Sequence, residues 1–269
     1  MKLVNAAKIG ILSLPLLLNG CTAEAHKPQE EAQQAQENKQ EFSSAEYESL
    51  KAALDKEIGV EKSSQSYEKS GHIIFIPDYN HFDPAVAAGY LKRVIDICKR
   101  NKIELAGIGL EGIISGKEAE GIDSFMNMPF AGGTLKNEKV AAAIQSGVPI
   151  YGIEGEESYG RGMELKKKVF PSQSLKYLNE AIEDGEITES EEARLNKMKE
   201  EEKAAQEELF GENLLKRSDD WVYNSRANGI VIVVGGAKHA ESLQKAAEKY
   251  GRSMITMKVS KEDQKFFGN

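Results

Sequence analysis

Residues 72–77 read His-Ile-Ile-Phe-Ile-Pro, a short apolar run that ends just before Asp78. A run of this length, rich in β-branched side chains, is typical of a strand that is buried on both faces. Asp83-Pro84 follows, and aspartate before proline is a favourable helix start. Apolar residues then recur at helical spacing through Cys98. The stretch 72–98 therefore predicts a strand followed by a helix, the first part of a βαβ unit.

The same alternation continues towards the end of the chain. Short apolar runs predict further strands at 105–110, 148–153, 230–234 and 254–259, and periodic segments predict helices at 137–145 and 240–250. Strands that are separated by helices favour a parallel sheet with helices packed on both faces. We therefore expect an α/β fold, with a mainly parallel sheet flanked by helices.

Two segments extend this α/β domain, which we expect to span residues 45–269. Residues 45–62 carry apolar side chains at helical spacing and predict a leading helix. Residues 160–212 are highly charged, with a break at Asp184-Gly185 and a capping box that starts at Thr188. We interpret this insertion as a helical hairpin that covers the sheet, or alternatively as a solvated interaction arm.

The first residues resemble an export signal. Lys2 and Lys8 supply positive charge, and residues 9–18 are mostly apolar but too few to span a bilayer well. Leu18-Asn19-Gly20-Cys21 resembles the lipobox of bacterial lipoproteins, where the chain is cut before the cysteine and the cysteine is acylated. We therefore expect residues 1–20 to be a signal peptide. The mature protein would be anchored by Cys21 in the cell membrane or outer membrane, on the exported face.

Residues 21–44 are rich in glutamate and glutamine and show no apolar periodicity. Such a segment cannot bury enough surface to offset the entropy lost on ordering. We expect a disordered tether between the lipid bilayer and the folded domain.

The composition narrows the class of protein further. The 269 residues carry a formal net charge of −8, and 40% of them are hydrophobic, as in ordinary soluble domains. The acidic balance argues against a broad nucleic-acid surface, which needs clustered lysine and arginine. The 2 cysteines cannot form a disulfide framework. Cys98 lies in an apolar stretch, so we expect a small buried side chain there.

Polar residues follow the predicted strands where each one ends. The first strand leads to Asp78 and His81, the second to Glu111, the third to Glu154, and the fourth to the segment Gly236–His239. In open α/β sheets, ligands bind in the crevice beyond the carboxyl ends of the strands. We therefore expect Asp78, Glu154 and Gly236 to contact a ligand, and His81, Glu111 and His239 to supply the chemistry.

Two histidines and a carboxylate at one edge of the sheet are typical of a catalytic site or a metal site. A histidine can act as a general base near neutral pH, and a neighbouring carboxylate can orient it. Alternatively, His81, His239 and Glu111 can bind a divalent metal that activates water. The residues leave both possibilities open.

The order of these motifs resembles a superfamily that groups TraB and TIKI-type proteins, erythromycin esterases and ChaN-like lipoproteins. In its members the first strand ends in Gly-Glu-x-His or Gly-Asn-x-His, and a second strand ends in glutamate. An arginine precedes a late strand, which ends in Gly-x-x-His. Gly236-Ala237-Lys238-His239 matches the last motif, and Leu110-Glu111-Gly112 fits the second. Arg217 is the expected arginine, with Arg226 as the alternative. Pro77-Asp78-Tyr79-Asn80-His81 departs from the first motif, because proline replaces glycine and the histidine lies one residue later.

The resemblance covers about residues 70–260 and implies more than one activity. Some members hydrolyse ester or peptide bonds, some of them with a metal, and ChaN-like members bind haem. For this chain it implies that His81 and His239 are bases or metal ligands. It also implies that Glu111 orients a histidine or water, and that Arg217 binds an anionic group or stabilises developing negative charge.

Two other functions remain open at this point. Phe125, Met126, Met128 and Phe130 lie in a glycine-rich loop and can line an apolar pocket for a ligand such as haem, or pack onto the core. A non-enzymatic binding lipoprotein is therefore one alternative. The other is a tethered interaction module, in which the acidic helical segment 172–208 contacts a partner protein.

Overall fold

The computed structural model describes one folded unit of the chain. The described residues are 44–66, 71–79, 84–118, 122, 129–130, 133–134, 137–169, 180, 183, 185, 188–225 and 229–264. The chain divides into two units, Met1–Gln40 and Glu41–Asn269, and all described residues lie in the second. The predicted signal peptide, Cys21 and almost all of the predicted tether therefore lie outside the described residues.

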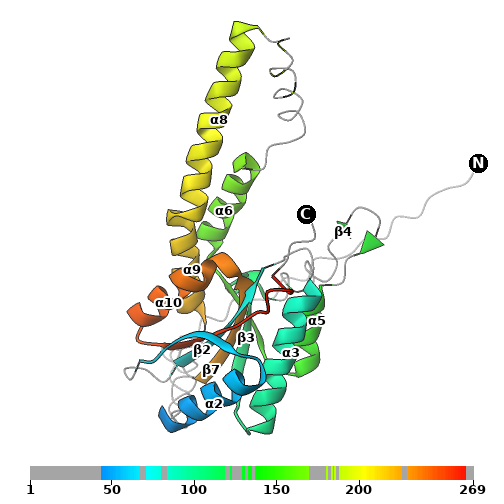
Figure 1. Ribbon diagram of the computed structural model, residues 1–269, viewed down its shortest axis with the longest axis vertical. Coiled ribbons are helices and arrows are strands. Elements are labelled where there is room, and N and C mark those ends of the chain that lie inside the picture. The colour runs from blue at the N-terminus through cyan, green and yellow to red at the C-terminus, as the bar shows by residue number, and fades with distance from the viewer. Residues whose placement is uncertain are drawn as a thin grey trace, which may run out of the picture. The chain divides into compact units, whose positions relative to one another are not determined.

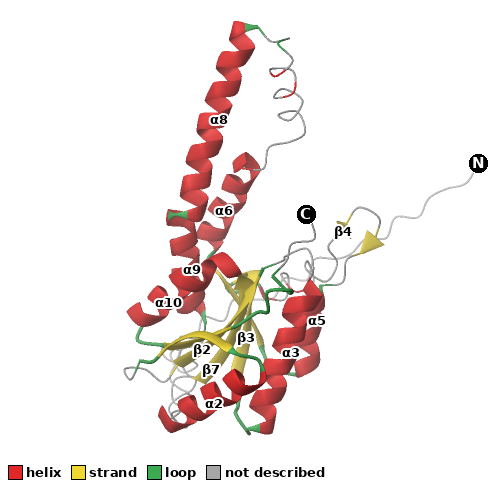
Figure 2. Ribbon diagram, viewed as in Figure 1, coloured by secondary structure: helices red, strands yellow, loops and turns green. Residues whose placement is uncertain are grey.

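The described unit has a six-stranded, mainly parallel sheet, which confirms the predicted α/β fold (Figures 1 and 2). Its strand order is β1-β8-β2-β7-β3-β6, and only β1 runs antiparallel to its neighbour. The strands are β1 (Val60–Ser64), β2 (Gly71–Asp78), β3 (Leu105–Ile114), β6 (Ile150–Glu154), β7 (Gly229–Gly236) and β8 (Ser253–Met257). Two short strands, β4 (Pro129–Phe130) and β5 (Gly133–Thr134), form a separate antiparallel pair.

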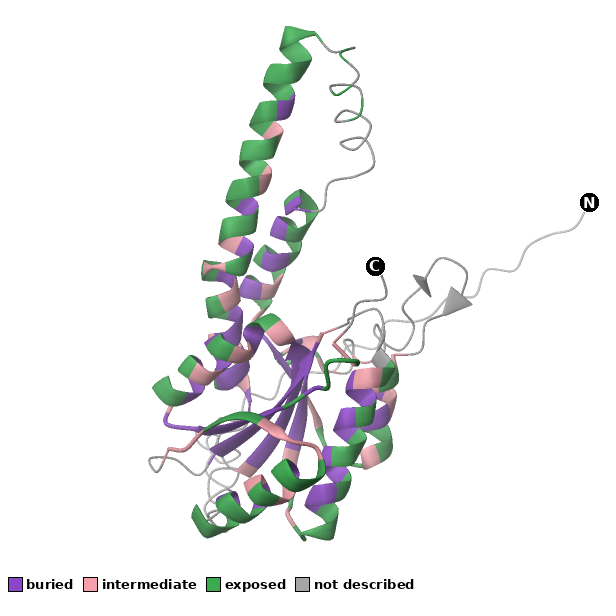
Figure 3. Cartoon of the chain, in the orientation of Figure 1, coloured by how far each residue is buried: buried purple, intermediate pink, exposed green. Residues whose placement is uncertain are grey.

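Helices cover both faces of the sheet and bury two apolar clusters (Figure 3). The larger cluster lies under α2 (Ser44–Glu57), α3 (Pro84–Arg100) and α5 (Glu138–Ser146). The other face packs against α9 (Glu212–Asn224) and α10 (Ala240–Lys249). All eight residues of β2 are buried, which explains its almost continuous apolar sequence.

The strand register brings the predicted polar residues to one edge of the sheet. Asp78, the last residue of β2, lies beside Gly236, the last residue of β7. Leu110 of β3 lies beside Val234 of β7, so the next residue of β3, Glu111, lies near the same edge. The predicted end of this strand at residue 110 is wrong, because β3 continues to Ile114 and Glu111 lies within it. Because these three strands are parallel, their carboxyl ends share this edge.

The predicted leading helix over residues 45–62 is wrong at its end. Helix α2 ends at Glu57, and Val60 begins the edge strand β1. Gly59 has a φ of 104°, a left-handed conformation that favours glycine and ends the helix. The Asp55 side chain accepts a hydrogen bond from the Val60 amide at 2.9 Å, which holds the chain in its new direction.

The helical insertion starts earlier than expected. Its first helix, α6 (Glu156–Val169), follows β6 directly, so the acidic residues after Glu154 form the first turn of a helix. Acidic side chains in a first turn complement the helix dipole. Helix α8 (Glu189–Phe210), later in the insertion, begins with the predicted capping box of Thr188 and Glu191.

Helices α6 and α8 pack on each other through a small apolar cluster of Leu165, Val169, Ala205 and Leu209. An exposed ion pair between Arg161 and Glu208 joins them as well. Most of α8 is exposed, as expected for a charged arm. None of the described helices is long and apolar enough to cross a membrane.

Candidate functional site

The centre of the site is a buried ion-pair cluster of Glu111, Glu154 and Arg217. Nε of Arg217 donates to Oε2 of Glu154 at 3.1 Å, and Nη2 donates to Oε1 of the same carboxylate. Nη2 also donates to Oε1 of Glu111 at 2.9 Å. Arg217 is 5% exposed, so its ion pairs are buried and not at the surface.

Glu154 is the most enclosed member of the cluster, with 0% exposure. Besides Arg217, it accepts hydrogen bonds from the Trp221 indole at 2.9 Å and from the Gly112 amide at 3.1 Å. Gly112 has a φ of 91° and lies where the register between β3 and β6 shifts. This irregular backbone presents its amide to the carboxylate, so Glu154 is fully partnered despite its burial.

Glu111 links the cluster to the last predicted motif. Its Oε2 accepts a hydrogen bond from the Gly236 amide at 2.6 Å. The glycine that begins Gly-x-x-His is therefore tied to the glutamate that follows the second predicted strand. This is a direct contact between two motifs that are 125 residues apart.

The cluster carries a net negative charge, because two carboxylates face one guanidinium. Burial lowers the pKa of Arg217, but the bonds to Glu154 and the charges of Glu154 and Glu111 outweigh it, so this pKa lies above its usual value. Arg217 therefore stays charged. The pKa of Tyr159, whose ring lies 5.8 Å from the guanidinium carbon, is raised by burial and by the charge of Glu154.

His239 lies beside this cluster, in the short 3₁₀ helix Ala237–His239 that follows β7. Its ring is 3% exposed and stacks on Trp221, with 4.1 Å between centroids and 23° between planes. Its Nδ1 lies 2.8 Å from Oγ of Ser218. The imidazole is therefore fixed on one face by an indole and at one nitrogen by a hydroxyl.

Helix α9 supplies three of these contacts from one face. Arg217, Ser218 and Trp221 are spaced so that they share a side of the helix, and all three are buried. Arg217 was predicted from the sequence, but Ser218 and Trp221 were not. The sequence did contain an indication of their position. Arg217, Ser218 and Trp221 are spaced i, i+1, i+4, and a helical face that includes the single tryptophan of the chain is expected to point inward.

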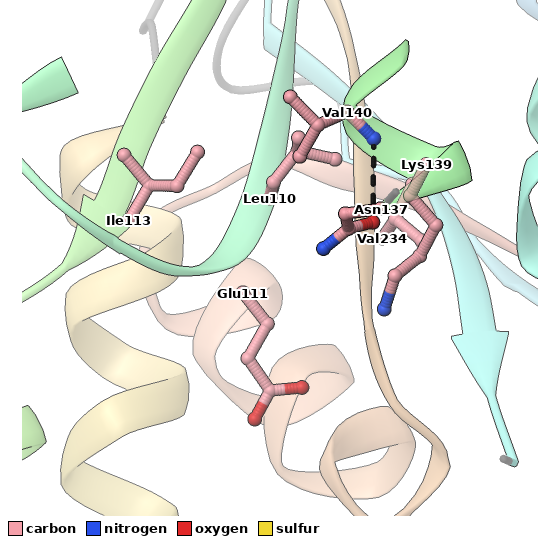
Figure 4. Close-up of a pocket in the computed structure, with 7 residues that line it drawn as sticks. All are labelled: Leu110, Glu111, Ile113, Asn137, Lys139, Val140 and Val234. Carbon is pink, nitrogen blue, oxygen red and sulfur yellow. Dashed lines mark hydrogen bonds between the residues drawn. The ribbon is translucent and has the colours of Figure 1, made fainter. Parts of the chain in front are cut away.

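Asp78 lies at the same edge but has a cationic partner of its own. Its Oδ2 accepts from Nζ of Lys139 at 2.5 Å, and both side chains are largely buried. Lys139 and Glu111 line a small pocket with Asn137, whose side chain caps α5 (Figure 4). The space inside the pocket is about 10 Å³, room for about one water molecule and far below the volume of a cofactor site.

Several predicted residues lie outside the described part of the chain. These are His81, the alternative arginine Arg226, and the loop residues Phe125, Met126 and Met128; the side chain of Phe130 is also not described. The predicted approach of His81 to His239 therefore stays a prediction. The same holds for the apolar haem pocket that depends on this loop.

The described residues do not form a metal site by themselves. No three histidine, cysteine, aspartate or glutamate side chains of the described ranges come together in an arrangement that could hold a metal ion. The predicted set of His81, His239 and Glu111 includes a residue outside these ranges.

Comparisons with protein-family models, with curated proteins and with solved structures found no match. The likeness to the TraB, erythromycin esterase and ChaN group therefore depends on the motifs of this chain.

Proposed function

We propose that this chain is a bacterial lipoprotein, anchored by acylated Cys21, whose α/β domain hydrolyses ester or peptide bonds with His239 as the general base. The observation that carries the proposal is the setting of His239. Its imidazole is held by Trp221 and Ser218 at the carboxyl edge of a parallel sheet, beside a buried cluster of net negative charge. This edge is where ligands bind in open α/β sheets.

The charge of the cluster suits a histidine that must accept a proton. In the proposed reaction, His239 removes a proton from water while the water oxygen bonds to the carbonyl carbon. The carbonyl oxygen takes up the negative charge. As the bond to the leaving oxygen or nitrogen breaks, the imidazolium returns its proton to the leaving group. The two carboxylates of the cluster and the face of Trp221 favour the imidazolium, whereas the burial of His239 opposes it.

Arg217 has a different role in this proposal from the one implied by the resemblance. Two of its nitrogens already hold Glu111 and Glu154. We assign it the positioning of these carboxylates, and through Glu111 the positioning of Gly236. Lys139 lines the same pocket as Glu111, but its ammonium is paired with Asp78, so we assign it the positioning of that carboxylate.

The test is turnover of a panel of esters and peptides by the full chain in detergent, with and without added divalent metals. We expect turnover of at least one class and its loss in His239→Ala. The matched control is Lys238→Ala, which changes the exposed neighbouring residue. Circular dichroism verifies the fold of both variants. Full activity in folded His239→Ala would exclude the assigned base, and no turnover of any substrate would contradict the hydrolase proposal.

A further inference from the structure

The small pocket between the start of α5 and strand β3 combines a space for one small molecule with polar groups of opposite kinds (Figure 4). Its space of about 10 Å³ is close to the minimum that a water molecule needs. A space with only apolar walls would stay dry. Here, however, Glu111, Asn137 and Lys139 are among the lining residues, so their polar groups determine what the pocket binds.

Asn137 directs an amide group into the pocket. It is the N-cap of α5, where its Oδ1 accepts a hydrogen bond from the Val140 amide at 3.5 Å. In Figure 4, its Nδ2 points from the start of α5 towards the space between Leu110 and Glu111. Within the described ranges, no group accepts a hydrogen bond from Nδ2. Two N–H donors of Asn137 are therefore available to a molecule in the pocket.

Lys139 and Glu111 add a second source of donors and an acceptor. The Lys139 ammonium carries three protons, and Asp78 is its one partner in the described part of the chain. The ionised carboxylate of Glu111 can only accept. Its two oxygens accept from Arg217 and Gly236, and each oxygen has two lone pairs. The pocket therefore has donors on α5 and an acceptor on β3.

This combination of groups favours water over an ion. A cation would be repelled by the Lys139 ammonium, and an anion would be repelled by the Glu111 carboxylate. A water oxygen can accept from Asn137 and Lys139 while a water proton is donated to Glu111. These are three partners, the usual number for a buried water.

We infer that one water molecule binds in this pocket, between Asn137, Lys139 and Glu111. The inference does not depend on the proposed hydrolysis, because no step of that reaction uses this water. The water connects the Asp78–Lys139 pair to the cluster around Arg217, and a bridge of this kind is nearly as favourable as a direct hydrogen bond.

The inference also gives a reason for asparagine at the N-cap of α5. Serine, threonine and aspartate cap helices as well. Asparagine is the N-cap residue whose side chain accepts with one atom and donates with another. At position 137 it can therefore hold the helix start with Oδ1 and the water with Nδ2.

Methyl NMR tests the water directly and without any assay of turnover. We would prepare the full chain in detergent, deuterated except for its isoleucine, leucine and valine methyl groups, and record NOE and ROE spectra at the water frequency. Methyl protons do not exchange with water, so a cross peak reports a water that stays bound nearby. We expect cross peaks at Ile113 and Val140, which line the pocket, and none at Ile74 in the core. Their absence at both pocket residues would overturn the inference, whether or not the protein proves to be a hydrolase.

Two neighbouring variants provide a matched comparison. Asn137→Thr keeps an oxygen that can cap α5 but puts a methyl group in place of the amide donors. The cross peaks at Ile113 and Val140 should fall roughly fivefold, the effect of losing one hydrogen bond to the water. Glu138→Gln changes the exposed next residue and should leave them unchanged.

The remaining outcomes also decide. Undiminished cross peaks in folded Asn137→Thr would overturn the inference, and so would an equal fall in Glu138→Gln. Methyl shifts of Ile113 and Val140 that titrate with sodium bromide would identify an ion in the pocket and exclude the water. If Asn137→Thr fails to fold, the spectra of the unchanged chain still decide.

Discussion

Arg217 and Glu154 form a buried ion pair in which two guanidinium nitrogens donate to the two oxygens of one carboxylate. The side chain of Glu154 is 0% exposed and that of Arg217 is 6% exposed. A two-bond pair of this kind fixes orientation as well as distance. It therefore sets where α9 lies against the strand ends, and with it the positions of Ser218 and Trp221.

Removing the guanidinium should destabilise the fold strongly. Arg217→Met leaves Glu154 buried without its cation, and we expect a loss of about 3–5 kcal/mol in the free energy of unfolding. Urea unfolding of the variant and the unchanged chain measures this loss. The control is Arg161→Met, which breaks the exposed pair with Glu208 and should cost about 1 kcal/mol or less. Equal losses would contradict the structural role of Arg217.

A methyl group at Gly235 should disturb the packing behind the site. An ideal Cβ there lies 2.5 Å from the Trp221 ring, which also stacks on His239. Gly235→Ala should therefore lower the free energy of unfolding by about 1–3 kcal/mol. Gly160→Ala is the matched control, because its Cβ meets nothing within 4 Å, and it should stabilise α6 by about 0.5–1 kcal/mol. Thermal unfolding of the two variants measures both changes. If Gly235→Ala leaves the stability unchanged, this account of the packing is refuted.

Cys98 should be unreactive in the folded protein. Burial raises the pKa of its thiol from 9.0 to about 12. Near pH 8 its thiolate is therefore about a thousandfold rarer than that of an ordinary thiol. In a Cys21→Ser background, a disulfide reagent should label Cys98 only after denaturant is added. Rapid labelling without denaturant would show that the thiol is accessible.

The Cys98 thiol also makes the free energy of unfolding depend on pH. Because the folded pKa is raised, the folded state keeps a proton that the unfolded chain releases. This contribution is complete below pH 9 and is lost as the pH rises from about 9 through about 12. Cys98→Ala should flatten that part of the stability curve, as followed by urea unfolding.

The lipid anchor has a direct test in cells. Cys21→Ser removes the predicted acylation site, so we expect the protein to move from the membrane fraction to the soluble fraction. Fractionation and immunoblotting measure this. A neighbouring substitution, Thr22→Ser, keeps the cysteine and should leave the protein in the membrane fraction. Unchanged membrane association of Cys21→Ser would refute the anchor.

The parallel strands could be predicted from the sequence, because each is buried and therefore appears as a short apolar run that ends at polar or turn residues. It was not sufficient for β1, whose residues Val-Glu-Lys-Ser-Ser are mostly exposed at the edge of the sheet. A polar edge strand has no periodic signal of its own. It is defined by its pairing with β8, nearly 200 residues later.

The candidate site divides in a similar way. The convergence of Glu111, Glu154 and His239 could be predicted, because the carboxyl ends of parallel strands share an edge. The strand ends themselves differ from the prediction, since Glu111 lies within β3 and Glu154 is the last residue of β6. The burial of Glu154 could not be predicted, since it depends on an indole that comes from a helix 67 residues later. Ser218 was also missed, because a serine in a charged helix gains its meaning only from the imidazole opposite it.

Helix α9 carries Arg217, Ser218 and Trp221 on one side, so three supports of the site share a single rigid element. A substitution that loosens α9 anywhere along its inner surface, for example at the buried Val222, would withdraw all three together. A mutational scan that measures activity alone would then assign a role in the reaction to residues that only hold α9 in place. For this protein, each loss of function must be paired with a melting curve before a residue is assigned to the reaction.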